Sequence, residues 1–199
     1  ELPGLERLDD GVALTFDDGP DPDATGPVLD ALDGIGAHAT FFVVGEQLTL
    51  HHELGGELVR RGHRVGLHCF HHESMARLER GETRDDLLRG LDAIEAATGE
   101  RPSLFRPPYG RLGRESYAAA QELGLQVVYW SAWGMDWEAL AAERLAELVR
   151  RDLTGGAIVL LHDSPRYGHR PNALPTAEAL PAIAEACASR GLTLTGLPG

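Results

Sequence analysis

Acidic, histidine and arginine residues gather in five short motifs, and each motif follows an apolar run of the chain. If these apolar runs are strands of a parallel sheet, their carboxyl ends meet at one edge, where the ligands and catalytic groups of α/β proteins collect. Five independent polar motifs at five such ends predict one active site. The motifs are Asp17-Asp18, His68 with His72, the run 106–110 (RPPYG), Asp136-Trp137 and His162-Asp163.

The spacing of His68 and His72 favours a metal site. On a helical turn, residues four apart lie on one face with Cβ atoms about 5–6 Å apart, a span that a metal with Zn–N bonds of roughly 2.0–2.1 Å can bridge. A carboxylate as third ligand would leave one position for water, as in catalytic zinc sites. The alternative is a histidine-rich surface turn, because His51, His52 and His71 dilute the signal.

Asp17 and Asp18 lie in the run 15–20 (TFDDGP), at the end of an apolar stretch. Adjacent side chains of an extended strand point to opposite faces, but a turn at Gly19 and Pro20 can bring both carboxylates into one pocket. Two crowded carboxylates raise each other's proton affinity, so one on the metal and one acting as a base is the arrangement that suits them. The alternative is an Asx-turn that simply ends the strand.

Short β-type runs alternate with helical patterns along the whole chain. Most of the β-type runs are continuous apolar stretches, as in strands buried on both faces. The helical pattern 84–97 has Thr83 as its expected N-cap. This alternation predicts one α/β domain over residues 1–199, with a parallel sheet that is either open or closed into a barrel. Strands are expected at 12–16, 39–44, 64–67, 103–106, 126–130, 157–161 and 192–195, and helices at 25–34, 53–61, 84–97, 114–123, 142–152 and 176–189, with 45–55 left open.

The composition excludes several classes of function. The 199 residues include 18 basic residues, all of them arginine, and 31 acidic residues, which gives a formal net charge of −13. Such a charge disfavours nucleic-acid binding, which needs stripes of basic residues, and binding to anionic membranes. The absence of lysine excludes Schiff-base catalysis and the lysine of a phosphate-binding loop. The apolar runs are far shorter than the roughly 20 residues of a membrane span, and no signal peptide is visible.

In their order along the chain, the five motifs resemble those of the polysaccharide deacetylases, the NodB-homology domain of carbohydrate esterase family 4. The runs 15–20 (TFDDGP) and 106–110 (RPPYG) are the most specific parts of this resemblance, which covers nearly the whole chain. The resemblance implies a single-domain distorted (β/α)7 barrel, similar to a TIM barrel, with its active site at the C-terminal ends of the strands.

The resemblance also implies roles for the motif residues. Asp18, His68 and His72 would hold one divalent metal ion, expected to be zinc. Asp17 would be the general base that takes a proton from a metal-bound water. Arg106 would pair with Asp17 and keep this carboxylate ionised.

The remaining motif residues would act on the substrate. The backbone N–H of Tyr109 would stabilise the oxyanion of the tetrahedral intermediate. His162 would be the general acid that protonates the departing amine, and Asp136 would orient it and raise its pKa. Leu160 and Trp137 would line the pocket for the acetyl methyl group.

The sequence departs from the family pattern at two positions. Cys69 follows the first histidine of the second motif, where Ser or Thr is usual, and its side chain is expected to point away from the metal-binding face. Trp133 stands where the fourth motif usually begins with Asp, and it offers a stacking face to a sugar ring. Trp130 is expected to pack between a strand and a helix.

These observations predict a metal-dependent hydrolase that removes acetyl groups from an N-acetylated glycan, chitooligosaccharide- or peptidoglycan-like, by attack of a metal-bound water. The alternatives are an O-acetyl esterase acting on acetylated xylan and a carbohydrate-binding protein with reduced catalysis. A phosphoesterase is disfavoured by a single metal site and by the net charge of −13. A monomer with an N-acetylated carbohydrate as its partner is expected, and the resemblance favours a secreted or cell-envelope location.

Overall fold

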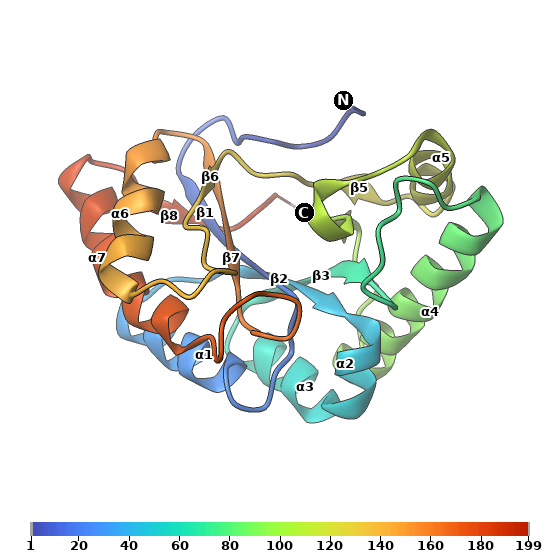
Figure 1. Ribbon diagram of the computed structural model, residues 1–199, viewed down its shortest axis with the longest axis horizontal. Helices are drawn as coiled ribbons and strands as arrows, with labels where there is room; N and C mark the ends of the chain where they lie inside the picture. The colour runs from blue at the N-terminus through green and yellow to red at the C-terminus, as the bar shows by residue number, and fades with distance from the viewer. Residues whose placement is uncertain (1, 199) are drawn as a thin grey trace.

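The computed structural model describes residues 2–198, which form a curled sheet with helices around it (Figure 1). The strands are β1 (Val12–Asp17), β2 (Thr40–Val44), β3 (Arg64–Cys69), β4 (Leu104–Phe105), β5 (Gln126–Val127), β6 (Ala132–Trp133), β7 (Ala157–His162) and β8 (Leu194–Thr195). The helices are α1 (Thr25–Gly34), α2 (Gly45–Leu50), α3 (His52–Arg60), α4 (Arg80–Thr98), α5 (Arg114–Glu122), α6 (Ala142–Asp152) and α7 (Leu174–Ser189), with a 3-10 turn, η1 (Pro108–Gly110).

Neighbouring strands of the sheet run parallel, in the order β5-β4-β3-β2-β1-β7-β6, with β8 beside β1. β1 and β2 are buried along their whole lengths. Their continuous apolar sequences follow from this position, because the helices cover the outer face of a sheet whose inner face is also packed. The parallel, curled sheet confirms the predicted α/β architecture of a distorted barrel.

In the described part of the chain, β5 and β6 form the two edges of the sheet. The segment before β1 lies across the gap between these edges (Figure 1). There Leu5 forms a bridge with Val128, and Arg7 forms a bridge with Ala157. The segment thus supplies backbone partners where the barrel does not close through its own strands.

Most predicted elements are confirmed with shifted ends. The predicted strand 126–130 stops at Val127, and the chain then enters β6, which pairs with β7 and was not predicted. The stretch 45–55, for which no element was predicted, forms α2 and the start of α3. Among the described residues, no helix combines the length and the apolar character needed to cross a bilayer.

Helix α4 begins four residues earlier than predicted, at Arg80. The cap is Glu79, which forms a capping box with Glu82. The prediction that Thr83 is the N-cap is therefore wrong. Thr83 is buried inside the helix, where its hydroxyl lies 2.9 Å from Ser116 Oγ of α5. A threonine just before an apolar helical pattern can be an N-cap or a buried residue bonded to a second helix, and the sequence alone does not distinguish the two.

The strand register places the predicted site residues side by side. Asp17, the last residue of β1, is the register partner of His162, the last residue of β7. Arg106 follows β4, and its backbone N–H donates to the oxygen of Leu67 in β3 at 2.9 Å. Each of these residues therefore lies at the carboxyl edge of the sheet, where side chains from different strands can meet.

Gly90 of α4 allows this helix to approach β3. A Cβ at position 90 would lie 2.5 Å from Leu67 Cδ1 and 3.3 Å from the carbonyl group of Cys69. We expect Gly90→Ala to lower the free energy of unfolding by about 1–3 kcal/mol, the usual effect of overpacking, as measured by urea denaturation.

Gly81 of the same helix provides the matched control, because a Cβ there meets nothing within 4 Å. Gly81→Ala should leave the free energy of unfolding unchanged or raise it by up to about 1 kcal/mol, since alanine is the better helix former. If Gly90→Ala and Gly81→Ala had the same effect, the close approach of α4 to β3 would not be a packing constraint.

Candidate active site

Eight of the eleven predicted site residues line a cavity of about 450 Å³ at the carboxyl edge of the sheet. Of the other three, Arg106 and Asp136 are fully buried, and Trp133 is half-buried outside the lining. The fold thus brings together residues that are up to 145 positions apart in the chain, Asp17 and His162. The lining residues are Asp17, Asp18, His68, His72, Tyr109, Gly110, Trp130, Trp137, Leu160, His162, Tyr167 and His169.

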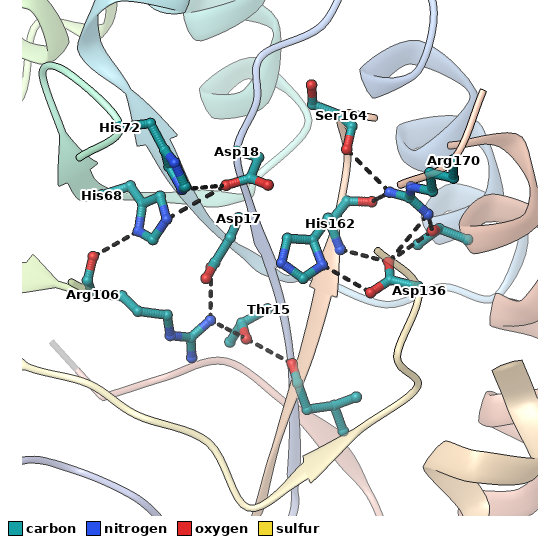
Figure 2. Close-up of polar contacts among 12 residues, drawn as sticks. Thr15, Asp17, Asp18, His68, His72, Arg106, Asp136, His162, Ser164 and Arg170 are labelled. Carbon is teal, nitrogen blue, oxygen red and sulfur yellow. Dashed lines mark hydrogen bonds and ion pairs between the residues drawn. The ribbon is translucent and has the colours of Figure 1, made fainter. Parts of the chain in front are cut away.

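Asp18, His68 and His72 converge at one side of this cavity, with their ligand atoms within 4.8 Å of one another. Asp18 Oδ1 lies 3.1 Å from His72 Nε2 and 3.5 Å from His68 Nε2 (Figure 2). The backbone of Asp18 adopts a positive φ of 80°. This conformation turns the chain sharply after β1, so that Asp17 and Asp18 both face the cavity but reach different partners.

The two histidines do not lie on a helical turn, so that part of the prediction is wrong. His68 belongs to β3, and His72 follows in the turn after this strand. The turn is held by Asp86 of α4, whose carboxylate accepts the backbone N–H groups of Phe70 and His71 at 2.8 and 2.9 Å. The imidazole rings of His68 and His72 still come together, with centroids 5.1 Å apart. A capped turn after a strand achieves the convergence that we expected from a helix.

The donor set of this cluster fits a divalent metal ion. His68 Nδ1 donates to the backbone oxygen of Arg106 at 2.6 Å, which leaves the Nε2 lone pair for a metal. Burial raises the pKa of the Asp18 carboxyl, but His162 and the two histidines of the cluster lower it well below its usual range. Two imidazole nitrogens and one carboxylate are the ligands of many catalytic zinc sites. Cys69 lies in the apolar core, where burial raises the pKa of its thiol, and is not part of the cluster.

Asp17 is held by a fully buried arginine. Arg106 Nη1 donates to Asp17 Oδ1 at 2.8 Å and to Thr15 Oγ1 at 2.7 Å. Its other N–H groups donate to the backbone oxygens of Val128 and Tyr129 at 3.4 and 2.9 Å. Burial lowers the pKa of Arg106, while Asp17 raises it. Because a guanidinium keeps its proton in proteins, Asp17 has a permanent cation beside it.

His162 faces the cavity from the opposite side and is held by Asp136. His162 Nδ1 donates to Asp136 Oδ1 at 2.8 Å, and the backbone N–H of His162 donates to Asp136 Oδ2, also at 2.8 Å. Burial lowers the pKa of His162, but Asp136, followed by Asp18 and Asp17, raises it to about 9. His162 is therefore protonated at neutral pH, and its Nε2 is free of the pairing with Asp136.

Two residues that hold Asp136 were missed by the sequence analysis. Thr176 Oγ1 donates to Asp136 Oδ2 at 2.8 Å, and Arg170 Nη1 lies 3.5 Å from the same oxygen. Burial raises the pKa of Asp136, but His162, Arg170 and Thr176 lower it overall. The only sequence signal was an arginine in a polar loop-like stretch, and such a residue is usually solvated.

The tryptophans are placed partly as expected. Trp137 and Leu160 line the cavity, at the positions predicted for a pocket wall. Trp133 lies half-buried in β6 and is not among the described residues that line the cavity. Its predicted part in substrate binding stays a prediction. Trp130, which we expected between a strand and a helix, lines the cavity instead.

Two tyrosines enclose the imidazole of His72. Tyr109 adopts a positive φ of 59°, and its ring meets that of His72 edge-on at a centroid distance of 4.8 Å. The ring of Tyr167 stacks on the face of the His72 imidazole, with centroids 4.0 Å apart and planes 11° from parallel. Tyr167 was not indicated by any motif, because it lies in a polar stretch, 166–172 (RYGHRPN), that carries no periodic pattern.

Asp163, next to His162, serves the turn that carries Asp18. Its carboxylate accepts the hydroxyl of Thr25 at 2.6 Å, and burial raises its pKa to about 7. A Cβ at Gly19 would clash with both Asp163 oxygens. The glycine in the TFDDGP run is therefore required by the close approach of Asp163.

Comparisons with known proteins agree with this geometry. Residues 6–128 match the family model for polysaccharide deacetylase. The chain is 35% identical over 194 residues to a chitooligosaccharide deacetylase of Bradyrhizobium sp., covering 94% of this chain and 89% of that protein. It is 30% identical over 187 residues to a peptidoglycan-N-acetylglucosamine deacetylase of Bacillus cereus, covering 94% of this chain and 66% of that protein.

Solved structures lead to the same assignment. A family 4 acetyl xylan esterase from Clostridium thermocellum, in complex with a cobalt ion, is 33% identical and superposes with a TM-score of 0.84, covering 93% of this chain and 87% of that chain. The chain spans about two thirds of the length of the Bacillus cereus relative. The family model matches more than half of the chain, and the predicted resemblance is confirmed. This chain therefore belongs to the polysaccharide deacetylases, the hydrolases of carbohydrate esterase family 4 that contain the NodB-homology domain.

Proposed function

We propose that this chain is a metal-dependent deacetylase that hydrolyses the acetamido group of an N-acetylated glycan, of the chitooligosaccharide or peptidoglycan type. The observation that carries this proposal is that one cavity contains a carboxylate paired with a cation and an imidazole paired with a carboxylate. The carboxylate of Asp17 pairs with the guanidinium of Arg106, while His162 is held protonated by Asp136. A protein that only binds carbohydrate needs neither group, so this arrangement disfavours the binding-protein alternative.

The base side of the reaction belongs to Asp17. Its Oδ1 is used by Arg106, so Oδ2 is the oxygen that accepts a proton from the attacking water. Asp18, His68 and His72 would hold the divalent ion, and zinc suits two imidazoles and a carboxylate. When bound, the ion supplies Lewis-acid polarisation of the acetyl carbonyl and lowers the pKa of a water.

The acid side belongs to His162. The amine of an amide is a poor leaving group unless it is protonated, and His162 can supply that proton from Nε2 at neutral pH. The backbone N–H of Tyr109 donates to the developing oxyanion in this scheme. Trp137 and Leu160, which line the cavity, form the apolar surface for the acetyl methyl group.

An O-acetyl esterase is the second candidate, because the Clostridium thermocellum relative is an acetyl xylan esterase. An ester needs less help from an acid, since an alkoxide leaves more readily than an unprotonated amine. The buried Asp136–His162 pair therefore favours the amide substrate. Acetate release from chitooligosaccharides, peptidoglycan and acetylated xylan, each with and without a chelator, tests both candidates. Turnover of acetylated xylan alone would overturn the amidase proposal. A peptidoglycan substrate would further support a secreted or cell-envelope location.

Mutations of Asp17 and of Asp18 should have different effects on metal binding and turnover. Asp17→Asn should keep the metal, because Asp17 is outside the cluster of ligand atoms, and lose about 10²–10⁴-fold in turnover as a missing general base. Asp18→Asn should weaken metal binding itself. Metal content measured after dialysis, beside kcat, distinguishes the two. Equal metal retention by both variants would contradict this division of roles.

Activity should fall as the pH rises through about 9, the pKa of His162, because the acid then loses its proton. Asp136→Asn removes the carboxylate that raises this pKa, so the alkaline limb of the kcat profile should move to lower pH. Glu138→Gln is the control, since Glu138 pairs with the exposed His169 instead. An alkaline limb that does not move in Asp136→Asn would mean that another group sets it.

The importance of His162 should depend on the bond that is cleaved. His162→Ala should reduce acetate release from N-acetylglucosamine oligomers by about 10²–10⁴-fold, the usual contribution of a general acid. Release from activated acetyl esters should fall much less, because their leaving groups need no proton. Parallel steady-state assays on the two substrates give the ratio, and equal losses would argue against His162 as the acid.

A further inference from the structure

We propose that Arg170 is a positioning residue that holds the acid side and the metal-ligand side of the site in one arrangement, through the segment 164–170. The proposal rests on the proposed function in one respect, since it takes His162 as the acid and His72 as a metal ligand. It adds a residue outside the five motifs, and a physical link between His162 at the end of β7 and His72 in the turn after β3, on opposite sides of the cavity.

Arg170 is buried and donates hydrogen bonds to the acid side of the site (Figure 2). Its Nη2 donates to the backbone oxygens of His162 and Ser164 at 3.0 and 3.1 Å. Its Nη1 donates to Thr176 Oγ1 at 2.6 Å and lies 3.5 Å from Asp136 Oδ2. The fork of one guanidinium therefore fixes the backbone at His162 and the carboxylate that orients its ring.

The hydroxyl of Thr176 completes this arrangement. It accepts from Arg170 and donates to Asp136 Oδ2 at 2.8 Å, while the same oxygen accepts the backbone N–H of His162. With Oδ2 occupied in this way, Oδ1 is the oxygen left to receive His162 Nδ1–H. The direction of the imidazole thus depends on a carboxylate that Arg170 and Thr176 keep from rotating.

The same segment reaches the metal-ligand side through Tyr167. Between Ser164 and Arg170 the chain folds back on itself, with Gly168 N–H donating to the oxygen of Pro165 at 3.1 Å. Tyr167 leaves this turn toward the cavity and stacks on His72 at 4.0 Å. Because Arg170 ties Ser164 and its own position to the barrel, it anchors the two ends of the turn that carries Tyr167.

His72 depends on this stacking more than His68 does. His68 is oriented by a hydrogen bond from Nδ1 to a backbone oxygen, the usual support of a metal-binding imidazole. His72 Nδ1 is buried and has no hydrogen-bond partner among the described residues. Apart from the contact of its Nε2 with Asp18, its ring is therefore oriented by packing, and the nearly parallel ring of Tyr167 makes the closest ring contact.

Arg170→Met tests the proposal, with Arg166→Met as the matched control, since Arg166 lies in the same turn but is exposed. In Arg170→Met, kcat for N-acetylglucosamine oligomers should fall about 10–100-fold with little change in KM, and kcat for activated acetyl esters should fall much less. The affinity for zinc or cobalt, measured by competition with a chelating dye, should fall about 10–100-fold, as for other lost supports of metal ligands. Arg166→Met should change neither quantity.

Two further variants separate the two arms of the link. Thr176→Val should lower the amide-to-ester ratio without changing metal affinity, because Thr176 contacts only the acid side. Tyr167→Leu should weaken metal binding and alter the visible spectrum of the bound cobalt ion, with the amide-to-ester ratio unchanged. Only Arg170→Met should show both effects.

A folded Arg170→Met protein with equal losses on both substrates and unchanged metal affinity would overturn the proposal, because a merely structural role predicts that pattern. If Arg170→Met does not fold, Arg170→Lys replaces it, since lysine keeps the charge but lacks the fork, and the same two effects are expected. If the wild-type chain releases no acetate from any N-acetylated glycan, the proposed function fails. The cobalt spectrum of Arg170→Met still decides the link: a change supports it and an unchanged spectrum overturns it.

Discussion

The buried guanidinium of Arg106 is the constraint on which the rest of the site depends. It has no solvent exposure, so each of its N–H groups needs a protein partner. Those partners are Asp17 and Thr15 of β1 and two backbone oxygens after β5. The backbone oxygen of Arg106 in turn accepts from the metal-side His68. One residue thus holds the carboxylate of Asp17 through its guanidinium and orients the imidazole of His68 through its backbone oxygen.

The cavity gives Asp17 and His162, the two groups proposed to transfer protons, neighbours of opposite charge. Asp17 faces a permanent cation, whereas His162 faces the carboxylate of Asp136, and its pKa rises to about 9. The two groups end adjacent strands and are register partners. Separation of acid and base over so short a distance requires that their counter-charges lie on opposite sides, as Arg106 and Asp136 do.

Side chains of the helices hold parts of the site, because the helices pack closely against the strands. Asp86 at α4 caps the turn between His68 and His72, and Gly90 of the same helix lets α4 lie against β3. Thr176, near the start of α7, reaches Asp136. Helix packing therefore adjusts both sides of the cavity, and the close contacts that stabilise the barrel also orient the site.

The sequence by itself determined the parallel sheet and the identity of most site residues, because continuous apolar runs mark buried strands and parallel strands collect the residues after them at one edge. Asp17, Asp18, His68, His72, Arg106 and His162 were all predicted from these positions. The tertiary structure alone decided that Trp130 faces the cavity and Trp133 does not line it, because the strand stops at Val127 and the two-residue alternation of side chains is lost there. It also decided the parts played by Tyr167, Arg170 and Thr176. The contacts of Tyr167 and Arg170 arise where the segment after β7 folds back over the cavity, and a polar stretch carries no periodic pattern that reports which of its side chains become buried. Thr176 lies in the first turn of α7, and only the packing of this helix brings its hydroxyl to Asp136.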